Sequence, residues 1–172
     1  MLFDIFRNKK ILVTGHTGFK GSWLAFWLSQ LGTEVHGHSL PPNTEPNHYT
    51  AAHIHELMKS ECLADLRSRE QLMNYIHKVQ PDCIFHLAAQ PLVRRSYAEP
   101  VETFDTNVMG SIYIMDAVRT LGKPCTVIMI TSDKCYRNDH QIWGYRECEP
   151  LGGHDPYSAS KGCAELAISS YR

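Results

Sequence analysis

The sequence predicts an α/β fold, a doubly wound parallel sheet whose two faces are covered by helices. Two observations support this prediction. Short apolar segments typical of buried strands alternate with helical patterns along the whole chain. The first of these segments also runs directly into a glycine-rich turn and then a helical pattern, the unit that opens many doubly wound domains. With 172 residues the chain suits one domain with a sizeable core, and we take residues 1–172 as that domain.

Strands are predicted where β-branched and other apolar residues form short runs between turn residues. The predicted strands are Lys10–Thr14, Glu34–Ser39, Asp82–Leu87 and Thr126–Thr131, with a weaker one at Cys62–Asp65. Apolar residues spaced three or four positions apart predict helices between them. The predicted helices are Ser22–Leu31, Arg69–Val79, Val101–Leu121 and a last one that begins near Tyr157. Loops are expected at Asn43–Thr50 and over most of Asp133–Pro156.

The helix faces and ends follow from local residue chemistry. One face of the first helix carries five apolar side chains, Trp23, Leu24, Trp27, Leu28 and Leu31. Gly32 is expected to end that helix. The second helix is expected to begin with Ser68 and Gln71 in a capping box and to stop at Pro81, and the third to end at Gly122.

Composition narrows the class of protein. The net charge is −1, with 43% apolar and 20% charged residues, so nothing indicates nucleic-acid binding or attraction to a membrane surface. No apolar run is long enough to span a bilayer, and the N-terminus lacks a signal-peptide pattern. The six cysteines are scattered without a C-x-x-C pair, so we expect free, buried thiols in a cytoplasmic protein.

Histidines raise the question of a metal site. Ten are present, and His48, His53 and His55 lie close together in the sequence. They belong to a polar, proline-bearing stretch without an ordered ligand spacing. We therefore expect no metal there and interpret the stretch as a solvated loop and a short surface helix.

A glycine triplet follows the first strand. Gly15, Gly18 and Gly21 are spaced G-x-x-G-x-x-G, and a helical pattern begins directly after them. Gly15 permits the tight turn, Gly18 lets backbone approach a pyrophosphate, and Gly21 lets the helix pack close to the strand. The phosphates then lie on the unpaired amides and the positive dipole end of the helix. This placement predicts a dinucleotide site rather than a plain turn.

The residues alone leave the choice of dinucleotide open. Sites specific for NAD usually carry an acidic residue at the end of the second strand, but residues 35–40 include neither an acid nor an arginine that would pair with an NADP phosphate. Lys20 is either a phosphate contact or a solvated lysine. Asp65, followed by Leu66, is either a contact to the adenine amino group or a helix-capping residue. Small residues after the fourth strand let backbone run close to the cofactor, namely Leu87, Ala88 and Ala89.

Tyr157 and Lys161 form a Y-x-x-x-K spacing. In a helix both side chains lie on one face, and a nearby ammonium lowers the pKa of a phenol. Thr131 and Ser132 lie at the carboxyl end of a predicted central strand, where doubly wound sheets bind their ligands. A hydroxyl, a tyrosine and a lysine beside a nicotinamide predict a hydride-transfer centre.

At this point the chain resembles a known family, the extended short-chain dehydrogenases/reductases of the Rossmann fold, in their nucleotide-sugar epimerase/dehydratase group. Within it, the chain is similar to the CDP-glucose branch of the 4,6-dehydratases. The segments that carry the resemblance are Gly15–Leu24, Ala88–Arg94, Thr106–Gly110, Thr131–Tyr136 and Asp155–Leu166. Asp133 is the most branch-specific residue among them, because an epimerase has an inert small residue there.

The resemblance implies a lyase that uses NAD and a nucleotide-sugar substrate without net redox change. Tyr157 takes the proton of the sugar 4-hydroxyl during C4 oxidation, and Ser132 bonds the 4-oxygen. Water is then lost across C5 and C6, and hydride returns to C6 to give CDP-4-keto-6-deoxyglucose. Lys161 holds the nicotinamide ribose and tunes Tyr157. The residues expected to contact the cofactor are Gly15, Thr17, Gly18, Phe19, Lys20, Gly21, Asp65, Leu66, Leu87, Ala88, Ala89, Asn107, Tyr157 and Lys161.

The elimination requires an acid and a base, and the resemblance gives these roles to Asp133 and Lys134. Better-known relatives carry Asp and Glu in these positions, so Lys134 is a departure. A charged lysine lowers the pKa of the neighbouring aspartate, whereas Lys134 is a base only if burial or Lys161 lowers its own pKa. We expect Asp133 as acid and Lys134 as base, with a structural ion pair as the alternative.

Two other readings remain, an epimerase and a cofactor-binding module without catalysis of its own. The chain stops at Arg172 inside a predicted helix, so we expect a C-terminal substrate domain to be absent from it. The family also pairs into homodimers through two helices, here Val101–Leu121 and the one that begins at Tyr157. Apolar side chains on these helices suit either a dimer or packing on the sheet, among them Ile112, Met115 and Ala164.

Overall fold

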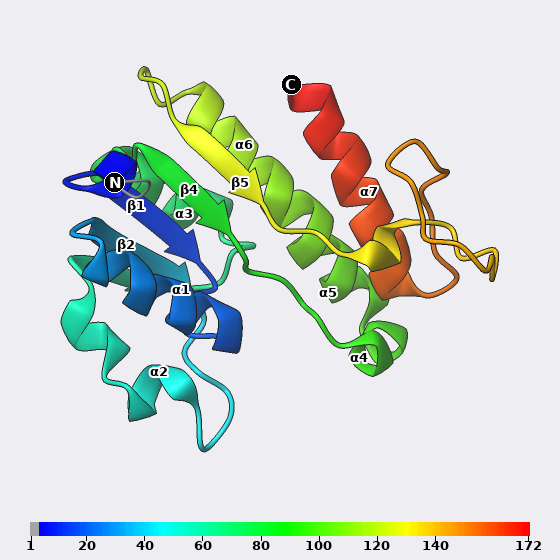
Figure 1. Ribbon diagram of the computed structural model, residues 1–172, viewed down its shortest axis with the longest axis horizontal. Helices are drawn as coiled ribbons and strands as arrows, with labels where there is room; N and C mark the ends of the chain where they lie inside the picture. The colour runs from blue at the N-terminus through cyan, green and yellow to red at the C-terminus, as the bar shows by residue number, and fades with distance from the viewer. Residues whose placement is uncertain (1–3) are drawn as a thin grey trace. The chain divides into compact units, whose positions relative to one another are not determined.

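The computed structural model describes residues 4–172, and the chain divides into two compact units (Figure 1). The first unit comprises the residues up to 88 together with 116–130. The second comprises residues 89–115 and 131–172. All five strands lie in the first unit, and a short 3₁₀ helix, η1 (Asp4–Phe6), precedes them.

The first unit is built on a five-stranded sheet in the order β3-β2-β1-β4-β5, and all four pairings are parallel. The strands are β1 (Lys10–Thr14), β2 (Glu34–Ser39), β3 (Ser60–Leu63), β4 (Cys83–His86) and β5 (Thr126–Met129). The predicted parallel sheet is confirmed. The weak third strand was predicted two residues too late. The last two strands, β4 and β5, are shorter than predicted, because the chain leaves the sheet just before the candidate residues that follow each strand.

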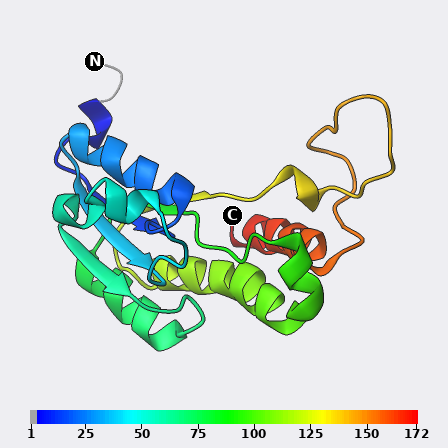
Figure 2. The same cartoon turned by 90° about the horizontal axis from the view of Figure 1, so that it is seen from below.

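Helices cover both faces of this sheet (Figure 2). On one face lie α1 (Phe19–Gln30), α2 (His48–Ala51) and the 3₁₀ helix η2 (Ile54–Leu57). On the other lie α3 (Arg69–Val79) and the end of α6 (Gly110–Arg119), where His77 Nε2 is 3.1 Å from the carbonyl oxygen of Ala117. The doubly wound arrangement is therefore confirmed. The loop predicted at Asn43–Thr50 is wrong in its last residues, which begin α2.

The packing face of α1 differs from the prediction. Its buried residues are Gly21, Ser22, Ala25 and Leu28. Trp23 and Trp27, placed inward from their spacing, are 50% and 52% exposed. A Cβ on Gly21 would lie 2.0 Å from the carbonyl oxygen of Gly15, so the face that carries Gly21 packs inward. Trp23, two residues on, then lies on the opposite side of the helix. The helix also begins at Phe19, three residues earlier than predicted.

The capping box predicted for α3 does not form. Ser68 does occupy the N-cap position, but its side chain makes no capping hydrogen bond. Its ψ of 74° lies outside the extended geometry that points a hydroxyl toward the first-turn amides. Gln71 instead extends toward Cys62, with Nε2 3.9 Å from the sulfur. The end of the helix before Pro81 is as predicted.

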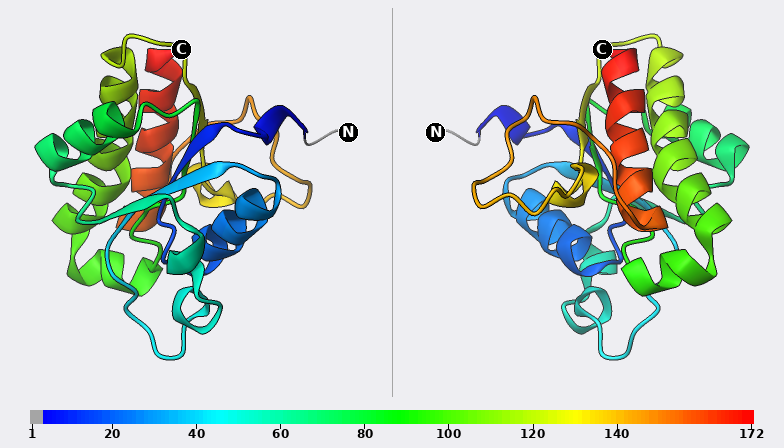
Figure 3. Two further views of the ribbon diagram at one scale, coloured as in Figure 1. Left: turned by 90° about the vertical axis from the view of Figure 1, so that its left-hand side faces the viewer. Right: turned by 90° about the vertical axis from the view of Figure 1, so that its right-hand side faces the viewer.

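The long helix predicted over Val101–Leu121, which begins in the second unit, is interrupted. It consists of α5 (Pro100–Phe104), a π-helical turn η3 (Asp105–Met109) and α6. A short helix that was not predicted, α4 (Val93–Ala98), precedes it. The loop predicted from Asp133 contains the 3₁₀ helix η4 (Asp133–Cys135). The last helix, α7 (Pro156–Tyr171), runs beside α5 (Figure 3).

Surface properties test several further expectations. Among the described residues, no helix combines the length and apolar character needed to cross a bilayer. The described cysteines are all free, but among them the expectation of a buried thiol holds fully for Cys135 alone and is wrong for the exposed Cys148 and Cys163. Met115 and Ala164 are 8% and 1% exposed and already packed within the chain, and the homodimer stays a prediction.

A histidine near the end of β2, His38, is shielded from solvent. His38 is fully buried, and neither of its ring nitrogens has a hydrogen-bond partner. Burial, assisted by the neighbouring His16, lowers the pKa of His38 to about 4. The native protein therefore holds His38 neutral, whereas the unfolded chain binds a proton there as pH falls below the ordinary histidine pKa of about 6.5.

We predict that this histidine makes the protein acid-labile. Because the unfolded state binds more protons, the stability that a neutral His38 supplies falls as the pH drops from about 6.5 toward 4, by on the order of 3 kcal/mol in total. His38→Phe should have a flatter pH dependence of the unfolding free energy across this window. Urea titrations at several pH values measure it, and parallel curves for the two proteins would contradict the prediction.

Candidate functional site

The glycine turn after β1 has the geometry of a phosphate cradle. Gly15 has a φ of +75°, and a Cβ there would lie 2.8 Å from the amide nitrogen of Ala88. Gly18 is the N-cap of α1 and supplies no side-chain cap, while Gly18, Phe19 and Lys20 are all exposed. The first amides of α1 are thus open to an anion at the positive end of the helix. The residues present fit the pyrophosphate of a dinucleotide.

A buried network supports this turn. His16 is fully buried and its Nε2 lies 2.9 Å from Oε1 of Glu61, which also accepts a 2.8 Å hydrogen bond from Tyr49. The imidazole fills the space over Gly37, where a Cβ would lie 2.6 Å from the ring. Burial lowers the pKa of His16 although Glu61 opposes the shift. A side chain at Gly37 would collide with the imidazole of His16, so this position of β2 needs a glycine.

Residues after β3 and β4 reach the same edge of this unit. Asp65 accepts hydrogen bonds from the backbone nitrogen of Arg67 at 2.8 Å and from its guanidinium at 2.6 to 3.1 Å. These bonds hold the pKa of Asp65 below its ordinary value, and they form a turn before α3 rather than a cap on it. Leu66 is buried. The amide of Ala88 donates to Thr14 Oγ1 at 3.2 Å, which places the backbone beside the glycine turn.

In the second unit, α7 presents Tyr157 and Lys161 on its first turns. Asp155 caps this helix, because its Oδ1 accepts from the amide of Ser158 at 2.9 Å. Tyr157 is partly buried, whereas Lys161 is 6% exposed. Burial lowers the pKa of the Lys161 ammonium, and the carboxylate of Glu165 opposes that shift.

The predicted acid and base lie on η4, which packs against α7. Ser132 donates to Asp133 Oδ1 at 3.1 Å, and Lys134 Nζ lies 3.5 Å from Oδ2. The Ser132 hydrogen bond first, and then Lys134, hold the pKa of Asp133 below its ordinary value. Asp133 and Lys134 are 80% and 59% exposed, so they form a solvated ion pair, and their roles as acid and base stay a prediction.

Glycines permit the contact between η4 and α7. A Cβ on Gly162 would lie 3.2 Å from the carbonyl oxygen of Cys135, which itself accepts a 2.8 Å hydrogen bond from the amide of Gly152. A Cβ on Gly153 would lie 2.2 Å from that of Ser158. The second unit thus brings the predicted Ser132, Asp133, Lys134, Tyr157 and Lys161 onto two adjacent elements.

Asn107 has a structural task in this unit. It lies in the π-helical turn and is 1% exposed. Its Oδ1 accepts from the amide of Gln90 at 2.8 Å, and its Nδ2 donates to the carbonyl of Gln90 at 3.1 Å and to Ser160 Oγ at 2.9 Å. Both amide hydrogens are therefore used within the protein, and Asn107 joins the segment after β4 to α7 between Tyr157 and Lys161.

Sequence reasoning missed Glu165. The carboxylate of Glu165 accepts a hydrogen bond from Thr131, at the start of the segment that carries Ser132. It also follows Lys161 by one helical turn, and a pair of opposite charges four residues apart on a helix is a signal that sequence analysis can detect.

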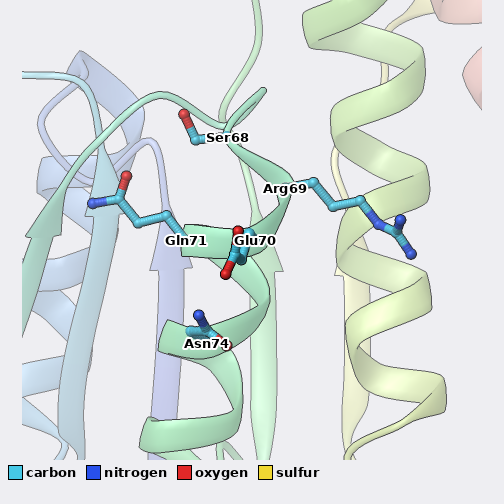
Figure 4. Close-up of a pocket in the computed structure, with 5 residues that line it drawn as sticks. All are labelled: Ser68, Arg69, Glu70, Gln71 and Asn74. Atoms are coloured by element: carbon cyan, nitrogen blue, oxygen red, sulfur yellow. The ribbon is translucent and has the colours of Figure 1, made fainter.

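A polar depression of about 530 Å³ lies at the first turns of α3 in the first unit (Figure 4). It is lined by Ser68, Arg69, Glu70, Gln71 and Asn74. None of the predicted site residues lines it, and its wall belongs to a single helix, so it has no part in the candidate site.

The histidine stretch places three potential ligands together. Atoms of His53, His55 and Glu56 lie within 4.8 Å of one another on the surface. His48, by contrast, stacks on Trp23 at a ring separation of 4.1 Å. An exposed group of this kind is common without an ion, and we assign no metal to it.

Comparison with known proteins finds relatives of this chain among nucleotide-sugar enzymes. A sequence model of the family described as GDP-mannose 4,6 dehydratase matches residues 12–172. The CDP-glucose 4,6-dehydratase of Salmonella typhimurium is 49% identical over 169 residues, which cover 98% of this chain and 47% of that protein. The GDP-mannose 4,6-dehydratase of Yersinia enterocolitica is 32% identical, with 95% and 46% covered.

A solved structure agrees with these relatives. The UDP-glucose 4-epimerase of Thermus thermophilus, in a complex with NAD, is 26% identical and superposes with a TM-score of 0.76 over 94% of this chain and 50% of that one. The chain thus spans about half the length of the proteins it matches. The resemblance predicted from the sequence is confirmed, and the chain belongs to the GDP-mannose 4,6 dehydratase family, within the extended short-chain dehydrogenases/reductases.

Proposed function

We propose that this protein is a nucleotide-sugar 4,6-dehydratase that acts on CDP-glucose with NAD. The observation that carries the proposal is the arrangement on η4 and α7, where a hydroxyl, a carboxylate and a lysine at Ser132–Lys134 adjoin the helix of Tyr157 and Lys161. The identity to a CDP-glucose 4,6-dehydratase supports the choice of nucleotide. Asp133 favours a dehydratase over an epimerase, because loss of water requires a group that moves a proton.

Each unit by itself carries groups that suit one part of the cofactor. In the first unit the open amides of α1 at Phe19 and Lys20 suit the pyrophosphate, and in the second unit Lys161 suits the nicotinamide ribose. NAD, when bound, supplies a hydride acceptor for C4 oxidation and a hydride donor for the return to C6. NAD in the complex of the related epimerase supports this choice over NADP.

The first proton transfer belongs to Tyr157. A phenol becomes a base at neutral pH when a positive charge stabilises the phenolate, and Lys161 follows Tyr157 by one turn of the same helix. Glu165 counteracts the effect of burial on the Lys161 pKa and so helps keep its ammonium charged. Tyr157 would accept the proton of the sugar 4-hydroxyl, and a Ser132 hydrogen bond would orient the 4-oxygen.

The elimination step depends on whether Ser132 donates its hydroxyl hydrogen to Asp133 or to the sugar oxygen. Ser132 has a single hydroxyl hydrogen, which it gives to Asp133 in this structure. When Ser132 turns to the sugar oxygen, Asp133 loses the hydrogen bond that lowers its pKa most, and exclusion of water raises that pKa further. A proton that passes from the Lys134 ammonium to Asp133 within their ion pair would then leave a neutral acid and a neutral amine. Asp133 would protonate the departing 6-hydroxyl, and the neutral Lys134 would remove the C5 proton, which the adjacent ketone makes acidic.

The reaction is tested with candidate nucleotide sugars in parallel. The chain is incubated with NAD and CDP-glucose, or with dTDP-, GDP- or UDP-sugars, and the products are analysed by mass spectrometry. A product lighter by one water from CDP-glucose alone is expected. An isomer of unchanged mass would indicate an epimerase. No product despite NAD binding would indicate a cofactor-binding module that lacks catalysis of its own.

Tyr157→Phe should abolish oxidation at C4, with a loss on the order of 10²- to 10⁴-fold, because the base is removed. NAD binding should persist, since the phenyl ring keeps its place on α7. Stopped-flow absorbance of the reduced cofactor and calorimetric titration of NAD measure the two properties. Tyr171→Phe, at the exposed end of the same helix, serves as the matched control. Normal turnover by Tyr157→Phe would remove this tyrosine from the mechanism.

Asp133→Asn should slow loss of water more than oxidation at C4, because an amide cannot donate the proton that the 6-hydroxyl needs. Reduced cofactor should therefore accumulate during single turnover. The control is Asp139→Asn, which alters an exposed carboxylate paired with Arg137 on the following loop. Failure of the oxidation step itself would show that Asp133 is not the acid of the elimination.

A further inference from the structure

The end of β2 in the first unit carries a pair of buried hydroxyls where NAD-binding domains usually place an acid. Ser39 is the last residue of β2 and is 8% exposed. Thr17, in the glycine turn, is 6% exposed, and its Oγ1 lies 2.7 Å from Ser39 Oγ. The same Thr17 oxygen lies 2.8 Å from the carbonyl oxygen of Leu40. Three oxygens thus form a short chain at the position that contacts the adenosine ribose in this fold.

The number of available hydroxyl hydrogens fixes which oxygen donates in each of these two hydrogen bonds. A carbonyl oxygen only accepts, so the single hydroxyl hydrogen of Thr17 is donated to Leu40. The bond between Thr17 and Ser39 must then be donated by Ser39. With its only hydrogen used, the Ser39 oxygen retains acceptor capacity alone. Ser39 therefore presents the hydrogen-bonding character of a carboxylate, although it is neutral.

The charged groups beside this position do not favour an extra phosphate. The chain leaves β3 next to Ser39, whose carbonyl accepts a 2.8 Å hydrogen bond from the amide of Ala64. Beyond it, Arg67 is bound by Asp65 through both guanidinium nitrogens that face the carboxylate. His38 stays neutral at pH 7 because it is buried. The adjacent carboxylate thus offsets the arginine charge that a phosphate dianion would use.

We propose that Ser39, oriented by Thr17, makes this protein select NAD over NADP. A ribose 2′-hydroxyl can donate its hydrogen to the free acceptor of Ser39. A 2′-phosphate dianion carries only acceptor oxygens. No hydrogen would then lie between the phosphate and the Ser39 oxygen, so the two would repel each other rather than form a hydrogen bond. This inference rests on the proposed use of a nicotinamide dinucleotide, and it assigns the choice of dinucleotide to the Thr17–Ser39 pair.

Calorimetric titration of the chain with NAD and with NADP tests the proposal. The wild type should bind NAD at least about tenfold more tightly. In Thr17→Val the Ser39 hydrogen is released and can turn to a phosphate, so the ratio of the two dissociation constants should fall several-fold. Thr17→Ser keeps the hydroxyl chain and should retain the ratio. Ser39→Ala should weaken NAD about fivefold and leave NADP nearly unchanged.

The outcomes separate this inference from the proposed function. Circular dichroism first verifies that each variant is folded, and Ser39→Ala provides a second route if Thr17→Val is not. Tight NAD binding with a ratio that neither Thr17→Val nor Ser39→Ala changes would overturn the role of the pair and leave the proposed function intact. Equal affinity of the wild type for NAD and NADP would also overturn the role of the pair and leave the proposed function intact. A folded wild type that binds neither dinucleotide would overturn both.

Discussion

The close approach of α1 to the turn after β1 is the constraint on which the first unit depends. Gly21 has no room for a side chain, because a Cβ there would lie 2.0 Å from the carbonyl of Gly15. The face of the helix that carries Gly21 therefore packs inward, and Trp23, which lies about 200° further round the helix, faces outward. The same approach leaves the amides of its first turn uncapped and open. The feature that strengthens packing thus also creates the anion site, so the two cannot be altered independently.

The second unit uses the same principle at different elements. Gly153 and Gly162 allow backbone from the long loop and from η4 to lie against α7, where side chains would collide. Asn107 adds a polar anchor that fixes the segment after β4 to the centre of α7. Of the candidate reactive side chains, Asp133 and Lys134 lie exposed at the margin of this rigid frame, whereas Lys161 is buried in it. For the exposed pair, rigid backbone behind them fixes their positions without burying their charges.

The fold was predictable from the sequence because strand and helix periodicity depends on short segments, and so was the placement of Tyr157 and Lys161 on one helix. The predictions from the sequence that were wrong share one cause. The inward packing of the Gly21 face of α1, which leaves Trp23 on the outer side, depends on a backbone contact that apolar spacing does not encode. The interruption of the long helix centres on Asn107, whose partners Gln90 and Ser160 are distant in sequence. Bonds between distant residues override local pattern at these positions.

Charge is distributed differently at the two candidate regions. At the carboxyl end of β2 the polar groups are buried and neutral, since His38 is held unprotonated and the hydroxyls satisfy one another. At η4 the carboxylate and the lysine are solvated and charged. A recognition site gains selectivity from buried groups with a fixed hydrogen-bond direction, because each unmatched ligand atom is costly there. A proton-transfer site instead requires groups whose pKa can change when a ligand displaces a neighbour, and the Ser132–Asp133 hydrogen bond is such a removable contact.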